Sequence, residues 1–132
     1  MYDVLVVGAG PAGLVAAIRL ARAGKSIALL DARPSVKFKV GECLPNAAQR
    51  LLSKLELPPL SLKIHKQIPG VISIWGNDLH QQDFMTSPEG PSWRLDRSLF
   101  EQTLEAAVLS SGVEKIFQRV RSSHRQQSGW QI

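Results

Sequence analysis

The N-terminal part of the chain places one amphipathic segment between two continuous apolar runs. Residues 2–7 (YDVLVV) form the first run, which ends at a glycine, and residues 26–31 (SIALLD) form the second. Runs of this length are typical of strands that are buried on both faces. Between them, residues 11–23 carry apolar side chains at helical spacing, namely Leu14, Ala17, Ile18 and Ala21. The pattern predicts a strand, a helix that ends at Gly24, and a parallel strand reached by a right-handed crossover.

The middle of the chain has a less regular pattern. Residues 45–57 predict a helix that ends at the following pair of prolines, with its apolar side at Ala48, Leu51, Leu52 and Leu55. Residues 70–76 (GVISIWG) predict a strand, residues 80–86 predict a weaker one, and a turn-forming cluster, SPEGP, follows at 87–91. We interpret residues 58–95 as an inserted segment that contributes to a substrate-side region.

A second helical pattern follows Asp96, whose side chain can cap a helix that runs to Gly112. The expected core side of this helix consists of Leu99, Phe100, Thr103, Leu104, Ala107 and Val108. Residues 113–120 (VEKIFQRV) predict a third strand, and Ser128-Gly129 predicts a hairpin turn before a returning strand. A sheet that stops so soon after its turn is unusual, so we expect the chain to be a fragment of a longer protein.

The composition is that of a globular domain. The chain has 132 residues, of which 44% are hydrophobic, so it can bury a core without a disulfide or a metal ion. Cys43 is the only cysteine, which excludes an internal disulfide and favours a reducing compartment. The sequence has neither a signal-peptide pattern nor an apolar stretch long enough to span a membrane. We therefore expect a cytoplasmic protein with no integral membrane segment, and peripheral membrane contact stays open.

The net charge of +5 is partly local. Between residues 114 and 125 only Glu114 opposes four basic residues, which are Lys115, Arg119, Arg121 and Arg125. Nucleic-acid binding requires a basic face interleaved with stacking aromatic residues, and this stretch offers only Phe117. We therefore expect no nucleic-acid partner and interpret the stretch as a solvated or anion-facing surface.

The segment between the first strand and the first helix has the spacing of a dinucleotide-binding fingerprint. Gly8, Gly10 and Gly13 form a G-x-G-x-x-G pattern, and Asp31 ends the second strand. In this fingerprint the first glycine makes the turn, the second admits a pyrophosphate and the third lets the helix pack closely. Pro11 suits the first helical turn, and the helix N-terminus favours an anion. Because the acid disfavours a 2′-phosphate, the residues predict a site for NAD or FAD and leave these two open.

Three stretches of the chain resemble FAD-dependent oxidoreductases. Residues 3–34 resemble the N-terminal signature of these enzymes in its GAGPAG variant. Residues 39–57 are similar to the GE-x-L-P segment of flavin-dependent halogenases, and residues 93–114 are similar to a segment with an aromatic residue and an Asp-Arg pair. Together they resemble the p-hydroxybenzoate-hydroxylase-like superfamily, which includes aromatic hydroxylases, tryptophan halogenases and geranylgeranyl reductases. The short pair IWG and WRLDR is also similar to flavoproteins that modify tryptophan in quinone-cofactor enzymes.

The resemblance implies an α/β fold, a Rossmann-like domain with a parallel sheet that forms the N-terminal part of a larger two-domain flavoprotein. It implies FAD as the cofactor, held by Gly8, Gly10, Pro11, Ala12, Gly13, Asp31, Arg33, Gly41, Glu42 and Arg97. The first five residues would hold the pyrophosphate, Asp31 would hold the adenosine ribose, and Arg33 would lie near the adenine or a phosphate. Gly41 and Glu42 would pass beside the flavin. Most relatives have glutamate at the ribose position, so the contact of the shorter Asp31 would be longer.

Arg97 has two interpretations. By resemblance it would reach back to the cofactor, and alternatively it is a helix-start arginine that pairs with Asp96 or Glu101. The later motif that closes over the flavin in such proteins is absent, as is most of their substrate sheet, because the relatives are much longer. The chain would then hold the ADP half of a flavin site without the walls around the isoalloxazine ring.

The resemblance implies a flavin-dependent oxidoreductase (a monooxygenase, halogenase or reductase) that acts on a small organic substrate. Its electrons would come from NAD(P)H or from a flavin reductase. The alternative is a truncated, non-catalytic module that binds FAD or ADP and needs a second polypeptide. An NAD-dependent dehydrogenase rests on the glycine fingerprint alone. No catalytic residue is assigned, because the cofactor carries the redox chemistry in flavoenzymes.

The remaining reactive side chains favour structural interpretations. Lys37, Lys39 and the following helix can activate the Cys43 thiol, but a small packed residue beside the cofactor is the simpler interpretation. Lys37, Lys39 and Glu42 form either a charge cluster near the flavin or a solvated loop. No metal site is expected, because no metal-ligand spacing relates the three histidines, His65, His80 and His124. Three tryptophans either line a pocket or pack in the core, and they are Trp75, Trp93 and Trp130.

Overall fold

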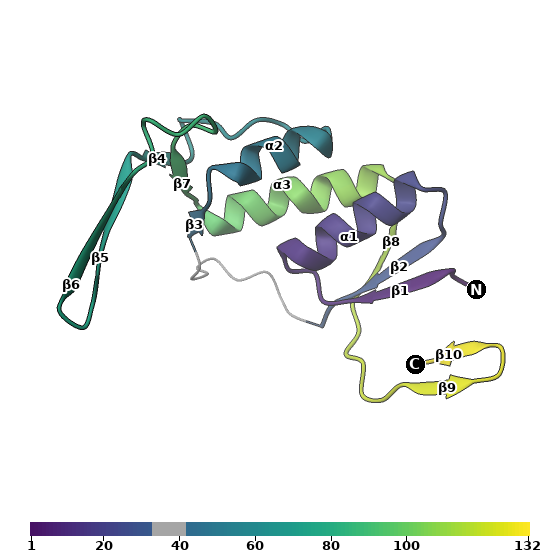
Figure 1. Cartoon of the computed structure of the whole chain (residues 1–132). Coiled ribbons are helices and arrows are strands. Elements are labelled where there is room, and N and C mark those ends of the chain that lie inside the picture. The colour runs from purple at the N-terminus through teal and green to yellow at the C-terminus, as the bar shows by residue number, and fades with distance from the viewer. Residues whose placement is uncertain (33–41) are drawn as a thin grey trace. The chain divides into compact units, whose positions relative to one another are not determined.

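A computed structural model describes residues 1–32 and 42–132 of the chain (Figure 1). The described residues form three helices and ten strands in two compact units. The first unit comprises Met1–Ser35 and Glu101–Ile132, and the second comprises Val36–Phe100. Within the described part of the chain, every helix is too short or too polar to span a lipid bilayer.

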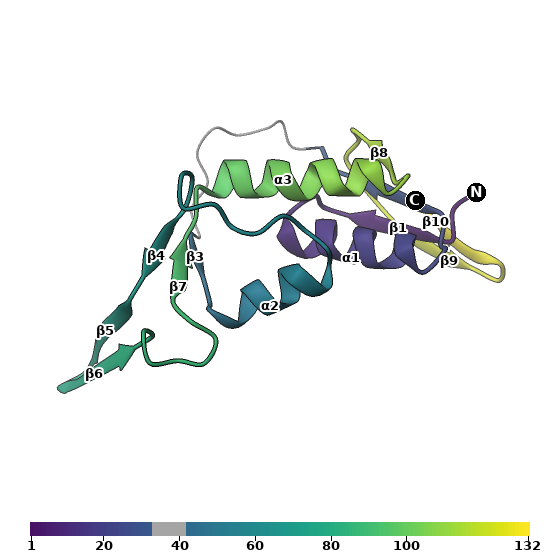
Figure 2. The same cartoon turned by 90° about the horizontal axis from the view of Figure 1, so that it is seen from above.

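The first unit is built on a three-stranded parallel sheet in the order β1-β2-β8. β1 (Val4–Val7) and β8 (Glu114–Ile116) flank β2 (Ile27–Leu30), whose four residues are all buried. Burial on both faces explains why the sequence of β2 is uninterruptedly apolar. α1 (Pro11–Arg22) connects β1 to β2 and packs on both strands (Figure 2). The predicted α/β class with a parallel sheet is confirmed.

α1 buries the side that its spacing predicts. Three of the four predicted core residues are almost inaccessible, and they are Leu14, Ala17 and Ile18. The helix ends at Gly24, which has a φ of +77°. The Gly24 amide donates to the Ala21 carbonyl at 2.9 Å, and the Lys25 amide donates to the Leu20 carbonyl at 3.1 Å. This pair of bonds is a Schellman motif, so the predicted stop at Gly24 is confirmed.

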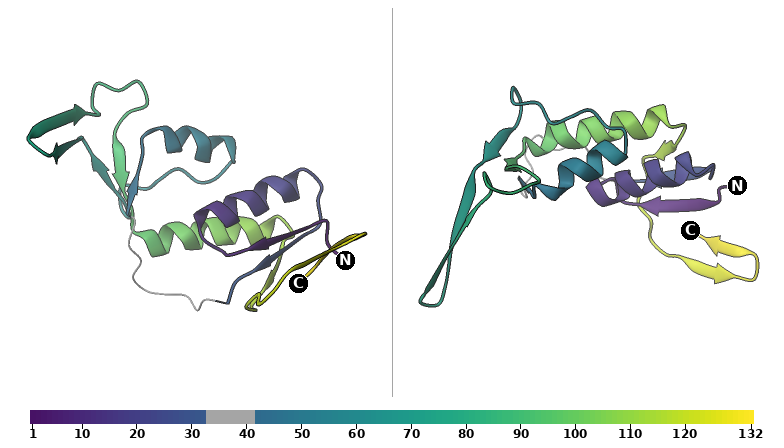
Figure 3. Two further views of the ribbon diagram at one scale, coloured as in Figure 1. Left: turned by 60° about the horizontal axis from the view of Figure 1, so that its bottom comes forward. Right: turned by 45° about the horizontal axis from the view of Figure 1, so that its top comes forward.

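The third strand is shorter than the sequence predicts for residues 113–120. β8 pairs with β2 only over Glu114–Ile116, and β2 is too short to offer a neighbour to the rest of the segment. Phe117, the next residue, is 68% exposed. The predicted hairpin is confirmed, since β9 (His124–Gln126) and β10 (Gly129–Gln131) pair antiparallel as a separate sheet (Figure 3).

α3 (Arg97–Ser110) begins where the sequence predicts, because the Asp96 carboxylate accepts a hydrogen bond from the Leu99 amide at 2.9 Å. Three of the predicted core residues are buried, and they are Phe100, Leu104 and Val108. The prediction is wrong for Leu99, which is 40% exposed, and for Thr103, which is also exposed. The buried stripe is rotated toward Glu101, which is buried, because the elements that α3 contacts lie on that side.

The second unit holds a three-stranded antiparallel sheet in the order β3-β7-β4. Its strands are β3 (Cys43–Leu44), β4 (Lys66–Ile68) and β7 (Ser92–Arg94). The sequence pattern predicts none of them, because runs of two or three residues carry no periodicity. β5 (Gly70–Trp75) and β6 (Asp78–Asp83) form an antiparallel hairpin, which confirms both strands predicted in this region (Figure 2).

α2 (Ala47–Lys54) is shorter than the helix predicted for residues 45–57. The chain leaves the helical path after it, and Glu56 has a positive φ of 51°. This turn brings Leu57 into the core, where it is buried together with Leu52 and Leu55. Leu51 is 57% exposed, so its predicted place on the core side is wrong. Leu57 takes the place in the core that the longer helix would have given to Leu51.

Candidate cofactor site

The loop between β1 and α1 carries the glycine fingerprint. Gly8 has a φ of +99°, a conformation that favours glycine. Its amide donates to the carbonyl oxygen of Leu30 at 2.7 Å, which fastens the end of β1 to the end of β2. Gly10 is the N-cap of α1, with an extended backbone (φ −77°, ψ 174°). The strand therefore turns into the helix within three residues of loop, Gly8 to Gly10.

Gly13 lies in the first turn of α1 and packs against this loop. A Cβ atom on Gly13 would overlap the carbonyl oxygen of Gly8 and lie 3.2 Å from its carbonyl carbon. It would also lie 3.5 Å from the Cγ1 atom of Val6 on β1. Only glycine permits this approach, so Gly13 sets how closely the N-terminus of α1 packs on β1.

The N-terminus of α1 is open and carries no negative side chain. Its first helical hydrogen bond joins the Leu14 amide to the Gly10 carbonyl at 2.9 Å, so the amides of Ala12 and Gly13 precede the helical pairing. No side chain caps this end, and its first turn contains Pro11 and no acid. A Cβ atom on Gly10 would meet no atom within 4 Å. Open amides at the positive end of a helix dipole fit a phosphate group.

Asp31 lies beside this loop at the end of β2. Its Oδ2 atom accepts a hydrogen bond from the Ala9 amide at 2.9 Å. Its own amide donates to the carbonyl oxygen of Ile116 at 3.1 Å. The half-buried residue thus joins the glycine loop to both neighbouring strand ends. A carboxylate next to a phosphate-binding helix end fits the ribose and pyrophosphate of a dinucleotide, although the ribose contact itself stays a prediction.

Two more residues that the resemblance assigns to the cofactor lie in the second unit. Glu42 precedes β3, and its Oε2 atom accepts a hydrogen bond from the Arg94 guanidinium at 2.8 Å. Its carbonyl oxygen accepts a second bond from the Leu95 amide at 2.7 Å. Glu42 therefore binds the end of β7 through both its side chain and its backbone. Arg97 is the first residue of α3, and the cofactor contacts of Glu42 and Arg97 stay predictions.

Known proteins share both the sequence and the fold. A sequence profile of the FAD binding domain matches residues 3–40. The 1H-pyrrole-2-carbonyl-(peptidyl-carrier protein) brominase of Pseudoalteromonas luteoviolacea is 30% identical over 114 residues, or 86% of this chain and 28% of the relative. Digeranylgeranylglycerophospholipid reductase 1 of Methanococcoides burtonii is 32% identical over 113 residues, with the same coverage of both chains. The solved structure of the flavin-dependent brominase Bmp2 superposes on 95% of this chain and 31% of its own, with a TM-score of 0.76 and 23% identity.

The chain belongs to the FAD-dependent oxidoreductase superfamily of halogenases and geranylgeranyl reductases. The assignment made from its sequence is confirmed, and the choice that the glycine loop leaves open between NAD and FAD narrows to an FAD-binding family. This member of the superfamily spans 28% of the length of the two curated relatives.

Four of the sequence predictions for this superfamily member lie outside the described residues. Arg33 and Gly41 fall in the segment 33–41, as do Lys37 and Lys39. Their predicted places beside the adenine, the flavin or the Cys43 thiol stay predictions. Among the residues that the structure describes, no three side chains of the metal-ligating types lie together.

The second-unit sheet separates a buried face from an exposed one. The register puts Trp93 beside Leu44 on one face, and puts Cys43 and Lys66 beside Arg94 on the other. Cys43 is exposed, so the expectation of a packed cysteine is wrong, because its side chain shares the charged face. Trp93 is buried, and its Nε1 atom has no hydrogen-bond partner among the described residues.

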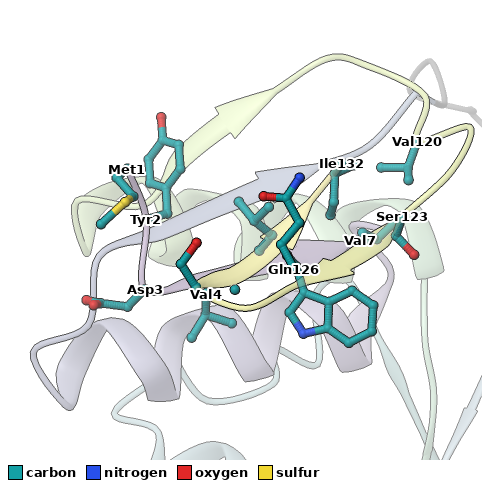
Figure 4. Close-up of a pocket in the computed structure, with 13 residues that line it drawn as sticks. Met1, Tyr2, Asp3, Val4, Val7, Val120, Ser123, Gln126 and Ile132 are labelled. Carbon is teal, nitrogen blue, oxygen red and sulfur yellow. The ribbon is translucent and has the colours of Figure 1, made fainter.

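A cavity of about 650 Å³ lies in the first unit (Figure 4). Its walls come from β1 and from the C-terminal hairpin, and they include Tyr2, Val4, Val7, Trp130 and Ile132. No residue from Gly8 to Gly13 lines it, so it is separate from the phosphate site. The Tyr2 hydroxyl donates to the Glu114 carboxylate, and this bond raises the pKa of Tyr2. The sequence pattern could not predict the cavity, because its walls come from opposite ends of the chain.

Proposed function

We propose that this chain provides the ADP-binding part of an FAD site in a flavin-dependent oxidoreductase that acts on a small organic substrate. The observation that carries the proposal is the open N-terminus of α1, where the amides of Ala12 and Gly13 have no capping side chain and no acid nearby. The kinship with a brominase and a lipid reductase supports the oxidoreductase class. The substrate and the electron source, NAD(P)H or a flavin reductase, belong to the proposal.

Each part of the loop has a physical task in this proposal. Gly10 leaves room for the pyrophosphate, whose charge the N-terminus of α1 stabilises. Asp31 accepts the ribose hydroxyls while it holds the Ala9 amide, and its charge repels a 2′-phosphate. Arg97 reaches the cofactor from the start of α3. When bound, FAD supplies the redox chemistry, in which hydride is accepted and electrons pass to dioxygen or to the substrate.

Titration of the purified chain with FAD, ADP, AMP and FMN tests the proposal. FAD and ADP should bind, because both carry adenosine and a diphosphate, and AMP should bind more weakly because it has a single phosphate. FMN lacks the ADP half and should not bind. Flavin uptake can be followed by its absorbance at about 450 nm. Uptake of NAD without any flavin, or FMN binding as tight as FAD binding, would overturn the proposal.

The β5–β6 hairpin favours a second candidate function, a cofactor-binding module that another polypeptide completes. Ile74 pairs with Leu79, and Ile72 lies on the same face of the hairpin. The exposed fractions of Ile72, Ile74 and Leu79 are 64%, 67% and 63%. A two-stranded hairpin is marginally stable alone, and an exposed apolar cluster marks an interaction surface. Because the chain spans 28% of its relatives' length, further flavoprotein polypeptide is the proposed occupant.

The coding sequence downstream of Ile132 distinguishes the two candidates. A continuing frame, or an adjacent gene, that carries the rest of a flavoprotein favours the enzyme. A stop codon followed by unrelated sequence favours the module. Both candidates require ADP binding at the glycine loop, so the titration above tests the site independently of this choice.

A further inference from the structure

The start of α3 is fixed by hydrogen bonds that converge on Asp96. Its carboxylate accepts the Leu99 amide at 2.9 Å, and its carbonyl oxygen accepts the Phe100 amide at 3.0 Å. The amide of Asp96 donates in turn to the Nδ1 atom of His65 at 3.1 Å. His65 therefore holds the residue that directly precedes Arg97. Through this bond, a side chain 31 residues upstream sets where the first turn of α3 begins.

His65 is itself held in place. The residue is 5% exposed, and its amide donates to the carbonyl oxygen of Ser61 at 2.8 Å. Its ring meets the buried Phe100 edge-on, with the ring centroids 6.5 Å apart and the planes at 80°. The backbone bond and the ring contact leave the imidazole little freedom to follow Asp96 if that residue moves. Nδ1 is thus a fixed acceptor.

The acceptor works only while Nδ1 carries no proton. Burial lowers the pKa of His65 from its ordinary value of 6.5, and the Asp96 carboxylate opposes this effect only in part. The ionisable groups on the elements around His65 are Lys66 on β4, Arg94 on β7, and Asp96, Arg97 and Glu101 at the start of α3. At neutral pH the ring is neutral and accepts the Asp96 amide. A proton on Nδ1 would set two donors against each other.

We propose that neutral His65 is a positioning residue for Arg97: it fixes the Asp96 amide, and its protonation releases the start of α3 and weakens retention of the cofactor. The inference rests on the proposed function, because Arg97 matters only if it contacts FAD. It adds a residue that the sequence pattern places in an irregular segment without any task. It also makes FAD affinity sensitive to mild acid, although the phosphate site itself contains no histidine.

The variants His65→Asn and His65→Leu test the proposal in the full chain. The Oδ1 atom of asparagine can occupy the place of Nδ1 and accepts a hydrogen bond at every pH, whereas leucine removes the acceptor. Between pH 8 and pH 5, the dissociation constant of FAD for the wild type should rise about fivefold to tenfold, the value of one hydrogen bond. H65N should keep wild-type affinity at pH 8 and show no such rise. H65L should bind about fivefold to tenfold more weakly at both pH values.

Two further measurements separate this proposal from the proposed function. The amide resonance of Asp96 in ¹⁵N NMR spectra should titrate with His65 in the wild type and stay constant in H65N, whether or not FAD binds. If FAD does not bind at all, the proposed function fails, and the NMR arm alone decides whether His65 controls Asp96. If FAD binds, Arg97→Met should abolish the pH dependence. A wild-type pH profile in H65N, or an unchanged profile in R97M, would overturn the inference.

Discussion

Gly10→Val separates the protein's own needs from those of its ligand. The backbone at Gly10 is extended, a conformation that any residue adopts, and an added Cβ atom meets nothing within 4 Å. Valine is a poorer N-cap than glycine, which costs about 1 kcal/mol, and it restricts the unfolded chain, which returns about 0.4–1 kcal/mol. We therefore expect the free energy of unfolding to change by less than about 1 kcal/mol.

The same side chain should be costly for binding. It would occupy the space in front of the Ala12 and Gly13 amides, where the proposed function places the pyrophosphate. Charge-assisted hydrogen bonds contribute about 1.5–3 kcal/mol each, so the loss of two costs about 3–6 kcal/mol. The dissociation constants of ADP and FAD should then rise at least about 100-fold. Isothermal titration calorimetry measures this change, and thermal unfolding without ligand measures the first.

Gly13→Ala is the matched control, because it fails for the opposite reason. Its Cβ atom would overlap the Gly8 carbonyl, so backbone must move, at a cost of about 1–3 kcal/mol or more. G13A should therefore lower the melting temperature in the absence of ligand, whereas G10V should not. If G10V bound ADP within about threefold of the wild type at an unchanged melting temperature, the reasoning that puts the pyrophosphate over Gly10 would be refuted.

Three further predictions concern other parts of the chain. Asp31→Asn should weaken ADP binding about fivefold to tenfold and abolish any preference for ADP over 2′-deoxy-ADP in calorimetry, and a preference that persists would contradict the ribose contact. Trp93→Phe should change the free energy of unfolding in urea by less than about 1 kcal/mol, because it removes a buried unpaired donor while it opens a small cavity; a loss above about 3 kcal/mol would contradict this balance. The Ser26 amide holds the pKa of Asp3 below its ordinary value of 3.8, so this carboxylate stabilises the fold fully above pH 3.8 and less as the pH falls below it. Asp3→Asn should therefore flatten the acid limb of urea unfolding midpoints, and an unchanged limb would show that the Asp3–Ser26 contact is absent in solution.

The sequence predicts elements whose cause is local. β1, α1 and β2 follow one another within about thirty residues, and each is marked by an apolar run or by helical spacing. The cap at Asp96 and the stop at Gly24 are likewise set by neighbours within one helical turn. The fingerprint glycines belong to this class, because the turn, the helix start and the close packing all involve residues of the same short segment.

The rest depends on partners far along the chain. The bond between Glu42 and Arg94 joins residues 52 positions apart, and strands β3 and β7 exist only because they pair with each other. No local pattern in the two residues of β3 could predict it. The core side of α3 fails in the same way: spacing defines an apolar stripe, but the elements packed on the helix decide that Glu101 is buried and Leu99 is exposed.

This division between local and distant causes has a consequence for the candidate site itself. Every group proposed to hold the ADP half, from Gly8 to Asp31, belongs to the first unit and is fixed by bonds within it. Glu42, His65 and Arg97 belong to the second unit, where their positions depend on β3, β7 and the start of α3. ADP affinity should therefore be the same in wild type and H65L, while FAD affinity falls in H65L. Parallel titrations with ADP and FAD measure the two effects separately, and equal losses for both ligands would mean that His65 supports the fold in general rather than the flavin half of the site.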